Sequence, residues 1–481
     1  MNNKLIILFI LLLGPSLLIA QGRIKGKVTD LQTGEPLIGA NVLVVGTSFG
    51  SASDVNGEYE IRNLNAGTYD VRASYIGYQT ITVSNVRVTT DLTTDLNFEL
   101  PGEGIEVQEV EVVAQRPLIQ KDNTNAIRTT TSDDIDALPV RNVSNIIGLT
   151  TGVTISNGFI FVRGGRSDEV GYYLEGIPVK NPLTNRNAVT LTKDALEEIQ
   201  VQAGGYTAEF GNANAGIIRQ QLKSGGPEYK ASLEYVTDNI GFRSKDDAYS
   251  GEKTLGAYWW GYNETIGTIS GPALDNLKFF VNFDYLYQKD NNPQPYPGVN
   301  LGMVGSSIAG NAPYDTISNL YYPAGPRKGV QSHTGTITGT LNYDLNPFII
   351  RATGTYSSFA GDAGGGLPGA TADNTPLPHS SLLNTRLGET DINNGSFTLK
   401  LTHIINPDVF YEITGGYYIR NTETYDKALK DDYWNYGDSV VNAAHGWTIP
   451  RAPYDYTHYN AANFGSDFPG RALVIDEYFL F

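Results

Sequence analysis

The sequence predicts a mainly β protein built from an N-terminal β-sandwich, a compact mixed α/β unit and the strands of an antiparallel β-barrel. Apolar and polar residues alternate over many short segments, and turn residues separate these segments at close spacing. No long apolar helical stretch follows the first twenty residues. If this chain enters a membrane, it therefore does so as a barrel.

Composition limits the classes of function. The chain has 481 residues, a formal net charge of -17 and no cysteine. The length suggests about three domains, and the missing cysteines exclude disulfides and thiolate metal sites. Phosphate binding needs clustered Lys and Arg, and no such run occurs, so we expect no nucleic-acid partner. We also expect no metal and no cofactor.

Residues 1–20 have the pattern of a secretory signal peptide. Lys4 precedes the apolar run 5–13, and a second apolar stretch ends at Ala20. The run is shorter than the ~20 residues that a membrane-spanning helix needs. Leu18 occupies a position where a small residue is preferred, so the sequence defines the cleavage site only to within a few residues.

Short alternating segments in residues 22–100 predict a small β-sandwich. Val42 and Val44 share one strand face, and Val71 and Ala73 share another. The stretch resembles the carboxypeptidase regulatory-like domain in the blocks 26–30, 36–42, 54–59 and 67–69. That resemblance implies a non-catalytic, seven-stranded sandwich with a carbohydrate-binding-like fold. Whether it binds a sugar or acts only as a periplasmic spacer stays open.

A polar linker, residues 101–126, follows the sandwich. It contains an acidic, β-branched alternation at 106–114. An extended strand of this kind can pair with the sheet of another protein by β-augmentation. The alternative is that it forms a strand of the next domain.

Residues 127–226 predict a compact mixed domain. A short helix contains Asp133 to Ile135, with Thr131 or Ser132 as its cap, and stops before Pro139. A second helix buries one face, and a third short helix precedes Ala195. The adjacent Glu197 and Glu198 are interpreted as solvated helix charges. The buried face of the second helix carries the apolar residues Val143, Ile146 and Ile147.

This stretch resembles the plug domain of TonB-dependent receptors. The matching blocks are 149–153, 161–165, 174–179, 198–201, 204–205, 208–212, 215–218 and 223–225. One departure is Glu175, where the family usually has Asp. The plug-motif residues are Arg163, Gly164, Gly165, Arg166, Glu175, Gly176, Gly204, Gly205, Gly211 and Gly216. Glycines permit tight turns and close backbone approach.

The charged motif residues Arg163, Arg166 and Glu175 are expected to pair with lumen side chains or with each other, as exposed contacts of ~0 to 1 kcal/mol each. In the receptor family the segment pulled by TonB immediately precedes the plug. The resemblance therefore implies TonB contacts at Val107, Glu109, Val110, Val112 and Val113.

Residues 227–481 predict the N-terminal part of a transmembrane barrel. Apolar residues alternate with polar ones at 279–287, 397–402 and 409–420, although Phe280 interrupts the polar face. Tight turns alternate with long polar loops near 289–333 and 358–395. About eight strands are counted, too few to hold a plug. We therefore expect further strands beyond Phe481, the alternative being that residues 478–481 are a true terminal strand.

The resemblance, together with the barrel pattern, implies a TonB-dependent outer-membrane receptor with its N-terminal domain in the periplasm. We expect it to import a small nutrient ligand, such as a glycan, a peptide or a metal chelate. The expected partners are the TonB complex, outer-membrane lipid and a surface lipoprotein. The alternative is a passive adhesin or structural barrel without energised transport.

An enzyme is not expected. The five histidines are scattered, and no HExxH, P-loop or nucleophile-elbow pattern occurs. Ligand-binding residues cannot be assigned from the sequence. The aromatic residues Trp259, Trp260, Trp434 and Trp447 could stack on sugars, or serve as membrane-girdle and loop-packing residues.

Overall fold

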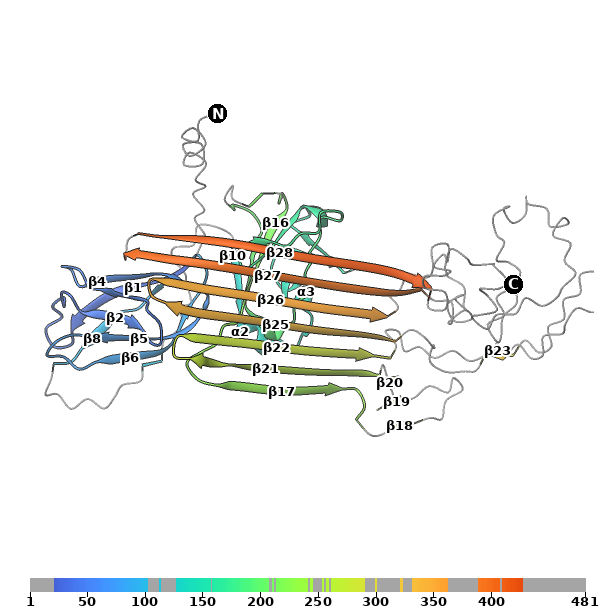
Figure 1. Cartoon of the computed structure of the whole chain (residues 1–481), viewed down its shortest axis with the longest axis horizontal. Coiled ribbons are helices and arrows are strands. Elements are labelled where there is room, and N and C mark those ends of the chain that lie inside the picture. Colours follow the sequence, from blue (N-terminus) through green and yellow to red (C-terminus); the bar gives the residue numbers. More distant parts are fainter. Residues whose placement is uncertain are drawn as a thin grey trace, which may run out of the picture.

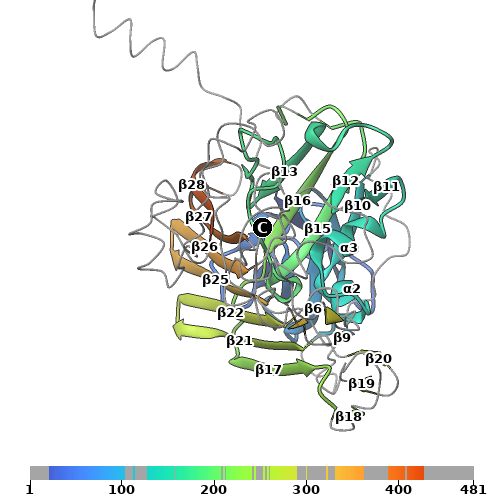
Figure 2. The ribbon, with the colours of Figure 1, turned by 90° about the vertical axis from the view of Figure 1, so that its right-hand side faces the viewer.

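The computed structural model arranges the chain as three units (Figure 1). A sandwich of residues 21–102 lies at one end, an antiparallel wall sheet runs along the longest axis, and a mixed plug unit packs against that sheet (Figure 2). The structure describes residues 21–102, 112–113, 127–156, 158–206, 210–211, 213–240, 243–244, 253–254, 257–258, 261–289, 299–300, 321–322, 331–361, 388–406 and 409–426. No helix within these ranges has the length and apolar character needed to cross a membrane.

The sandwich consists of two facing sheets around one apolar core. The first contains β1 (Gly22–Asp30), β4 (Glu58–Leu64), β7 (Thr93–Asp95) and β8 (Phe98–Leu100). The second contains β2 (Asn41–Val44), β3 (Gly50–Ala52), β5 (Gly67–Ser74) and β6 (Ile81–Val88). The predicted inward faces are confirmed, because Val42, Val44, Val71 and Ala73 are all fully buried.

A short segment of the linker adds to this second sheet. Strand β9 (Val112–Val113) pairs in parallel with the free edge of β6, with Val83 opposite Val112 and Ser84 opposite Val113. The neighbouring linker residues 103–111 and 114–126 lie outside the described residues.

The plug unit is built on a five-stranded sheet of order β10-β15-β16-β13-β14. Its strands are β10 (Ile127–Thr131), β13 (Val170–Leu174), β14 (Ile177–Pro178), β15 (Leu196–Gln202) and β16 (Gly216–Leu222). A hairpin of β11 (Val153–Ser156) and β12 (Phe159–Val162), the helices α2 (Ser132–Ala137) and α3 (Val143–Gly148), and the 3₁₀ turns η1 (Ser167–Glu169) and η2 (Lys193–Ala195) complete it.

Two of the predicted helices are confirmed. Helix α2 begins after Thr131, whose hydroxyl donates to Asp134 Oδ2 at 2.8 Å. Helix α3 buries Ile146 and Ile147. The third helix is reduced to the single turn η2. The prediction that Glu197 and Glu198 are solvated helix charges is wrong.

Glu197 and Glu198 lie in β15, not in a helix, and their exposed fractions are only 8% and 0%. Strand β15 is paired on both sides, and the sandwich covers its start. These carboxylates are therefore buried groups rather than solvated charges.

Within the described residues the wall sheet has seven strands in the order β17-β21-β22-β25-β26-β27-β28. The predicted count of about eight ran to Phe481, and residues 427–481 lie outside the described residues. Their bounds are β17 (Lys230–Thr237), β21 (Tyr262–Leu274), β22 (Leu277–Gln288), β25 (Ser332–Leu345), β26 (Phe348–Gly361), β27 (Gly388–Asn406) and β28 (Val409–Asp426). Two-residue strands accompany it: β18 (Arg243–Ser244), β19 (Lys253–Thr254), β20 (Ala257–Tyr258), β23 (Val299–Asn300) and β24 (Tyr321–Tyr322).

The two faces of the wall sheet differ as the alternation predicts. Apolar side chains on the outer face are exposed, and polar side chains on the inner face are buried against the plug unit. Outer residues include Phe283, Ile337, Leu341, Phe397, Leu399, Ile413 and Tyr417, and inner residues include Thr336, Thr338, Thr340, Arg351, Thr353, Thr355, Thr398 and Lys400. Phe280 points inward and joins the apolar core of the plug unit, which explains its break in the polar pattern.

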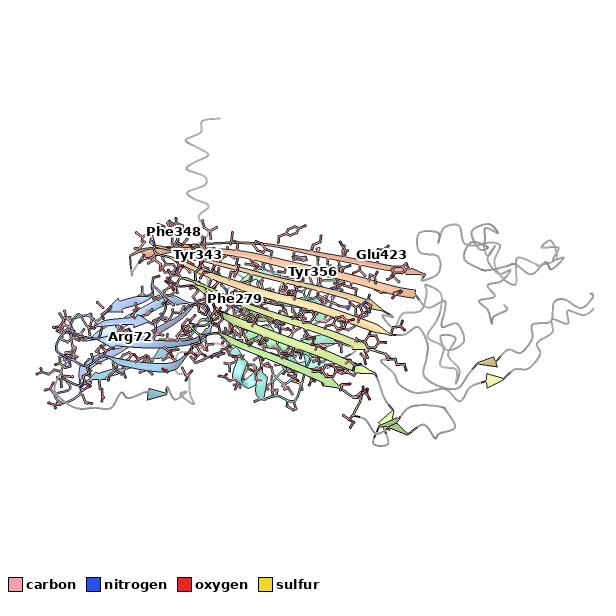
Figure 3. All side chains as sticks on the ribbon, turned by 60° about the horizontal axis from the view of Figure 1, so that its bottom comes forward. Arg72, Phe279, Tyr343, Phe348, Tyr356 and Glu423 are labelled. Atoms are coloured by element: carbon pink, nitrogen blue, oxygen red, sulfur yellow. The ribbon has the colours of Figure 1, made fainter. Side chains whose placement is uncertain are left out.

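The tight turns lie at the end of the wall sheet that meets the sandwich. Figure 3 shows Phe279, Tyr343 and Phe348 near that end and Glu423 toward the other. The predicted loop 358–395 is too long, because β26 continues to Gly361 and β27 begins at Gly388. The start of β27 is polar except for Ile392, so it lacks the alternation from which the strands were predicted.

Candidate functional site

The contact between plug unit and wall sheet centres on Glu175. It lies in the two-residue turn that joins β13 to β14, where Leu174 pairs with Ile177. Glu175 and Gly176 have φ values of 53° and 85°, the left-handed pair that such hairpin turns require. Glycine adopts this conformation freely, whereas a glutamate in it carries a cost of ~1–2 kcal/mol. The turn presents the Glu175 carboxylate to the wall sheet.

Arg351 on β26 receives this carboxylate in a two-pronged ion pair. Its Nε and Nη2 donate to Oε2 and Oε1 of Glu175, each at 2.9 Å. The backbone N–H of Leu222 donates to the same Oε1 at 2.7 Å, and Arg351 Nη2 also donates to the Leu222 carbonyl oxygen at 2.9 Å. One side chain of the wall sheet thus holds both the turn and the end of the last plug strand.

This pair is buried, since Glu175 and Arg351 are only 1% and 3% exposed. Burial by itself would raise the pKa of Glu175, but the charge and hydrogen bonds of Arg351 outweigh it and lower the pKa. The expectation of weak, exposed plug contacts is therefore wrong at Glu175. Removing one partner from a buried pair costs far more than breaking a surface pair.

The other two charged motif residues lie elsewhere. Arg163 is exposed at the turn after β12, where its φ of 49° is followed by 75° at Gly164. Arg166 pairs with Asp168 at 2.6 Å, and its side chain is 74% exposed. Their local contacts support the plug unit's own turn rather than its hold on the wall sheet.

The glycines of the plug motif differ in whether the structure requires a glycine at their position, and for what physical reason. Gly204 and Gly205 have positive φ values. At Gly216 an added Cβ would lie 2.8 Å from Val162 Cγ1, and at Gly165 it would lie 2.5 Å from the Cβ of a neighbouring alanine. A side chain at Gly211 would meet nothing within 4 Å. Close packing thus requires glycine at two of these positions and not at Gly211.

Further polar contacts join the plug unit to the wall sheet. Arg141 pairs with Glu264 at 2.7 Å, and Thr192 Oγ1 donates to Asn282 Oδ1 at 2.6 Å. Tyr418 donates its hydroxyl to a plug carbonyl at 2.6 Å. Beside them lies a cavity of about 580 Å³, lined by both units. The interface is therefore polar and incompletely packed rather than a close-packed apolar seal.

A second set of contacts, between sandwich and plug unit, carries no sequence motif. Arg87 pairs with Glu197 at 2.9 Å, and the Thr90 N–H donates to Glu198 Oε1 at 3.3 Å. Asp91 pairs with Arg219. Each partner lies more than a hundred residues from the other along the chain, so no local pattern reveals the pairing.

Burial dominates the electrostatics of this interface and raises the pKa of Glu198 to about 7. Within the described residues, Glu198 Oε2 has no hydrogen-bond partner. A neutral carboxyl group is therefore favoured at this position when the two units are docked.

The remaining predicted residues are distributed as follows. Of the five predicted TonB contacts, Val112 and Val113 form β9, and the other three lie outside the described residues. The tryptophans at 259, 260, 434 and 447 also lie outside them. His403 stacks on Phe348 at 4.4 Å between ring centroids, and the part of the chain that is described holds no group of three metal-binding side chains.

Comparisons with known proteins identify two domains. Residues 24–112 match the CarboxypepD_reg-like domain, and residues 119–217 match the TonB-dependent receptor plug domain. The chain is 24% identical to the TonB-dependent transporter Oar of Myxococcus xanthus, covering 92% of this chain and 43% of that protein. It is also 24% identical to TonB-dependent receptor P39 of Formosa agariphila, covering 95% of this chain and 49% of the other.

Among solved structures, the siderophore receptor PirA from Acinetobacter baumannii aligns with a TM-score of 0.43 and 15% identity. That alignment covers 62% of this chain and 40% of PirA. The chain spans less than half the length of the curated relatives it matches.

Proposed function

Because this chain belongs to the TonB-dependent receptors and carries a carboxypeptidase regulatory-like domain before its plug, we propose that it imports a nutrient ligand across the outer membrane. The ligand is a glycan, a peptide or a metal chelate. It passes through a barrel when the plug unit is displaced.

One observation carries this proposal: a compact domain packs on the polar face of a sheet whose opposite face is apolar. The outer residues Ile337 and Phe397 are about half exposed, while the inner residues Thr338 and Thr398 are buried. An apolar outer face suits lipid, and a polar inner face suits an aqueous passage. The plug unit occupies the space that the passage needs.

The proposed orientation places the sandwich in the periplasm. Outer-membrane barrels have short turns on the periplasmic side and longer loops outside. The short turns of the wall sheet lie next to the sandwich, and the strand ends that the long connections join lie at the far end. Strand β9, the described part of segment 106–114, then lies on the side where the TonB complex can reach it, and the proposed contacts are Val107, Glu109, Val110, Val112 and Val113.

The test uses the full-length protein in its own cells. A strain lacking the gene is first grown on defined glycan, peptide and iron sources to find the condition that depends on it. Residues 106–114 are then replaced by a Gly-Ser stretch of equal length, which keeps the linker length but removes the strand-forming side chains. We expect loss of growth on that source, while binding of the same compound to isolated outer membranes is retained.

The alternative, a passive adhesin or structural barrel, predicts no source-dependent growth defect and no effect of the replacement. Unchanged growth after the replacement, in cells whose growth does depend on the gene, would refute the assignment of 106–114 to TonB. A surface lipoprotein partner is tested separately, by recovering lipoproteins with the affinity-tagged receptor from outer membranes.

A further inference from the structure

The sandwich contacts two different parts of the receptor at once. On one side it meets the plug unit, and on the other it meets the turns of the wall sheet. We propose that the partner of the sandwich is this receptor itself: it bridges plug and wall at rest, and it releases the wall but stays on the plug when the plug moves. This inference rests on the proposed import function, because it requires a moving plug.

The plug-side contacts are buried and charged. Arg87 reaches Glu197 with Nη1 at 2.9 Å and the Glu197 carbonyl oxygen with Nη2 at 2.9 Å. The side chain of Gln200 donates to the Thr90 carbonyl oxygen at 2.8 Å. Arg219, which pairs with the sandwich, is 6% exposed. Separating the sandwich from the plug unit would leave these charges and amides without partners until water entered.

The wall-side contacts are fewer among the described residues, and apart from a part-buried bond from Gln21 Nε2 to Glu412 they are more open to water. The N–H and hydroxyl of Ser48 donate to Asp344 at 2.7 and 2.8 Å. Lys278 Nζ donates to the Gly46 carbonyl oxygen at 2.8 Å in an exposed position. Ser48 and Asp344 are half-buried, and water can replace each of these bonds as soon as the turns separate.

Because the described residues form more ion pairs and hydrogen bonds between sandwich and plug unit than between sandwich and wall sheet, the wall side is the side that yields. The connection of the chain supports the same order. The linker that carries β9 joins the sandwich directly to the plug unit, and β9 itself pairs with β6 of the sandwich. A pull on this linker acts on both units together and moves them away from the wall sheet as one body.

A spacer would not need this arrangement. A flexible periplasmic domain gains nothing from bonds to both the fixed wall and the moving plug. A bridge, in contrast, adds a second restraint that must be broken before the passage opens.

The experiment compares two cross-links in the full-length receptor. These 481 residues contain no cysteine, so introduced thiols are the only ones in this part of the protein. The wall-side pair is Ser48→Cys with Asp344→Cys. The plug-side pair is Thr68→Cys with Asp133→Cys, two exposed positions that both lie within 4 Å of the Arg87 guanidinium and leave its bond to Glu197 intact. A short bis-methanethiosulfonate reagent joins each pair without demanding disulfide geometry.

Plug movement is read from one more thiol, Thr192→Cys, which is buried where the plug unit meets the wall sheet. Cells are cross-linked in the presence of a proton uncoupler, so that the plug is at rest. The uncoupler and reagent are then removed, and biotin-maleimide is added. A monofunctional methanethiosulfonate serves as the matched control, because it modifies the same thiols without joining them.

We expect energised cells without a cross-link to label Thr192→Cys. The wall-side cross-link should reduce this labelling to the level of uncoupled cells. The plug-side cross-link and the monofunctional control should leave labelling unchanged. Full labelling despite the wall-side cross-link would overturn the bridge.

Two further results would also test the proposed bridge between plug unit and wall sheet. Loss of labelling with the plug-side cross-link would show that the sandwich leaves the plug, contrary to the order proposed. Absence of energised labelling in the receptor without any cross-link would overturn the proposed import, and the bridge with it.

Discussion

The strongest single test of the plug's attachment is the substitution Glu175→Gln. It keeps the shape of the side chain but removes the negative charge that faces Arg351. Arg351 is 3% exposed and would remain as a buried cation with hydrogen bonds but no counter-charge. The turn residue Gly176 and the backbone around it are unchanged by this substitution.

The expected cost follows from the burial of the pair. Breaking a buried ion pair by removing one partner costs about 3–5 kcal/mol. Local opening of the plug around this contact should therefore become about 10²- to 10⁴-fold more frequent, at one factor of ten for each 1.36 kcal/mol. The exposed pair of Arg166 and Asp168 provides the matched control, because Asp168→Asn should cost less than about 1 kcal/mol.

Hydrogen exchange of the Leu222 amide measures this opening directly, since that N–H donates to Glu175 Oε1 at 2.7 Å. Exchange is followed by mass spectrometry on the full-length receptor in detergent. The double variant Glu175→Gln with Arg351→Met removes both charges and should recover part of the protection. Equal exchange rates in Glu175→Gln and Asp168→Asn would refute the view that this pair holds the plug.

Three further predictions follow from the other contacts. Gly216→Ala should destabilise the plug unit by about 1–3 kcal/mol through overpacking, whereas Gly211→Ala should stay within about 0.5 kcal/mol; thermal unfolding of the two variants compares them. Burial raises the pKa of Glu198 from 4.5 to about 7 in the docked state, so the contribution of Glu198 to docking is full below pH 4.5 and is lost as pH rises to about 7. The protection factor of the Thr90 amide, which donates to that carboxyl group, should fall over this interval, and a flat profile would contradict the assignment. On the outer face, Phe397→Arg should disfavour the inserted barrel by about 2–4 kcal/mol while Phe397→Leu is tolerated, as measured by folding into lipid vesicles.

Local chemistry was sufficient to predict several elements. The cap at Thr131 and the stop before Pro139 define α2, because both signals lie within a few residues of the helix. The wall strands were predictable from alternation, since lipid and lumen impose opposite demands on successive side chains. Where that demand ceases, as in the polar start of β27, the sequence was misread as loop.

The decisive contacts were not predictable because they join distant parts of the chain. Glu175 was singled out as a motif residue, but its partner Arg351 lies 176 residues away. Glu197 and Glu198 were interpreted as solvated because nothing nearby in sequence covers them. The sandwich, a separate domain, covers them. Burial by a separate domain leaves no pattern in the neighbouring sequence.

Hydroxyl groups on the inner face of the wall sheet bond partly to each other. Thr336 pairs with Ser357 at 3.1 Å, and Thr338 pairs with Thr355 at 3.0 Å, each across neighbouring strands. Thr340 instead donates to a plug carbonyl at 2.8 Å, and Thr398 Oγ1 has no hydrogen-bond partner among the described residues. In the proposed import, departure of the plug would leave the two pairs in place, and the lone pairs that each hydroxyl keeps would let water wet this face.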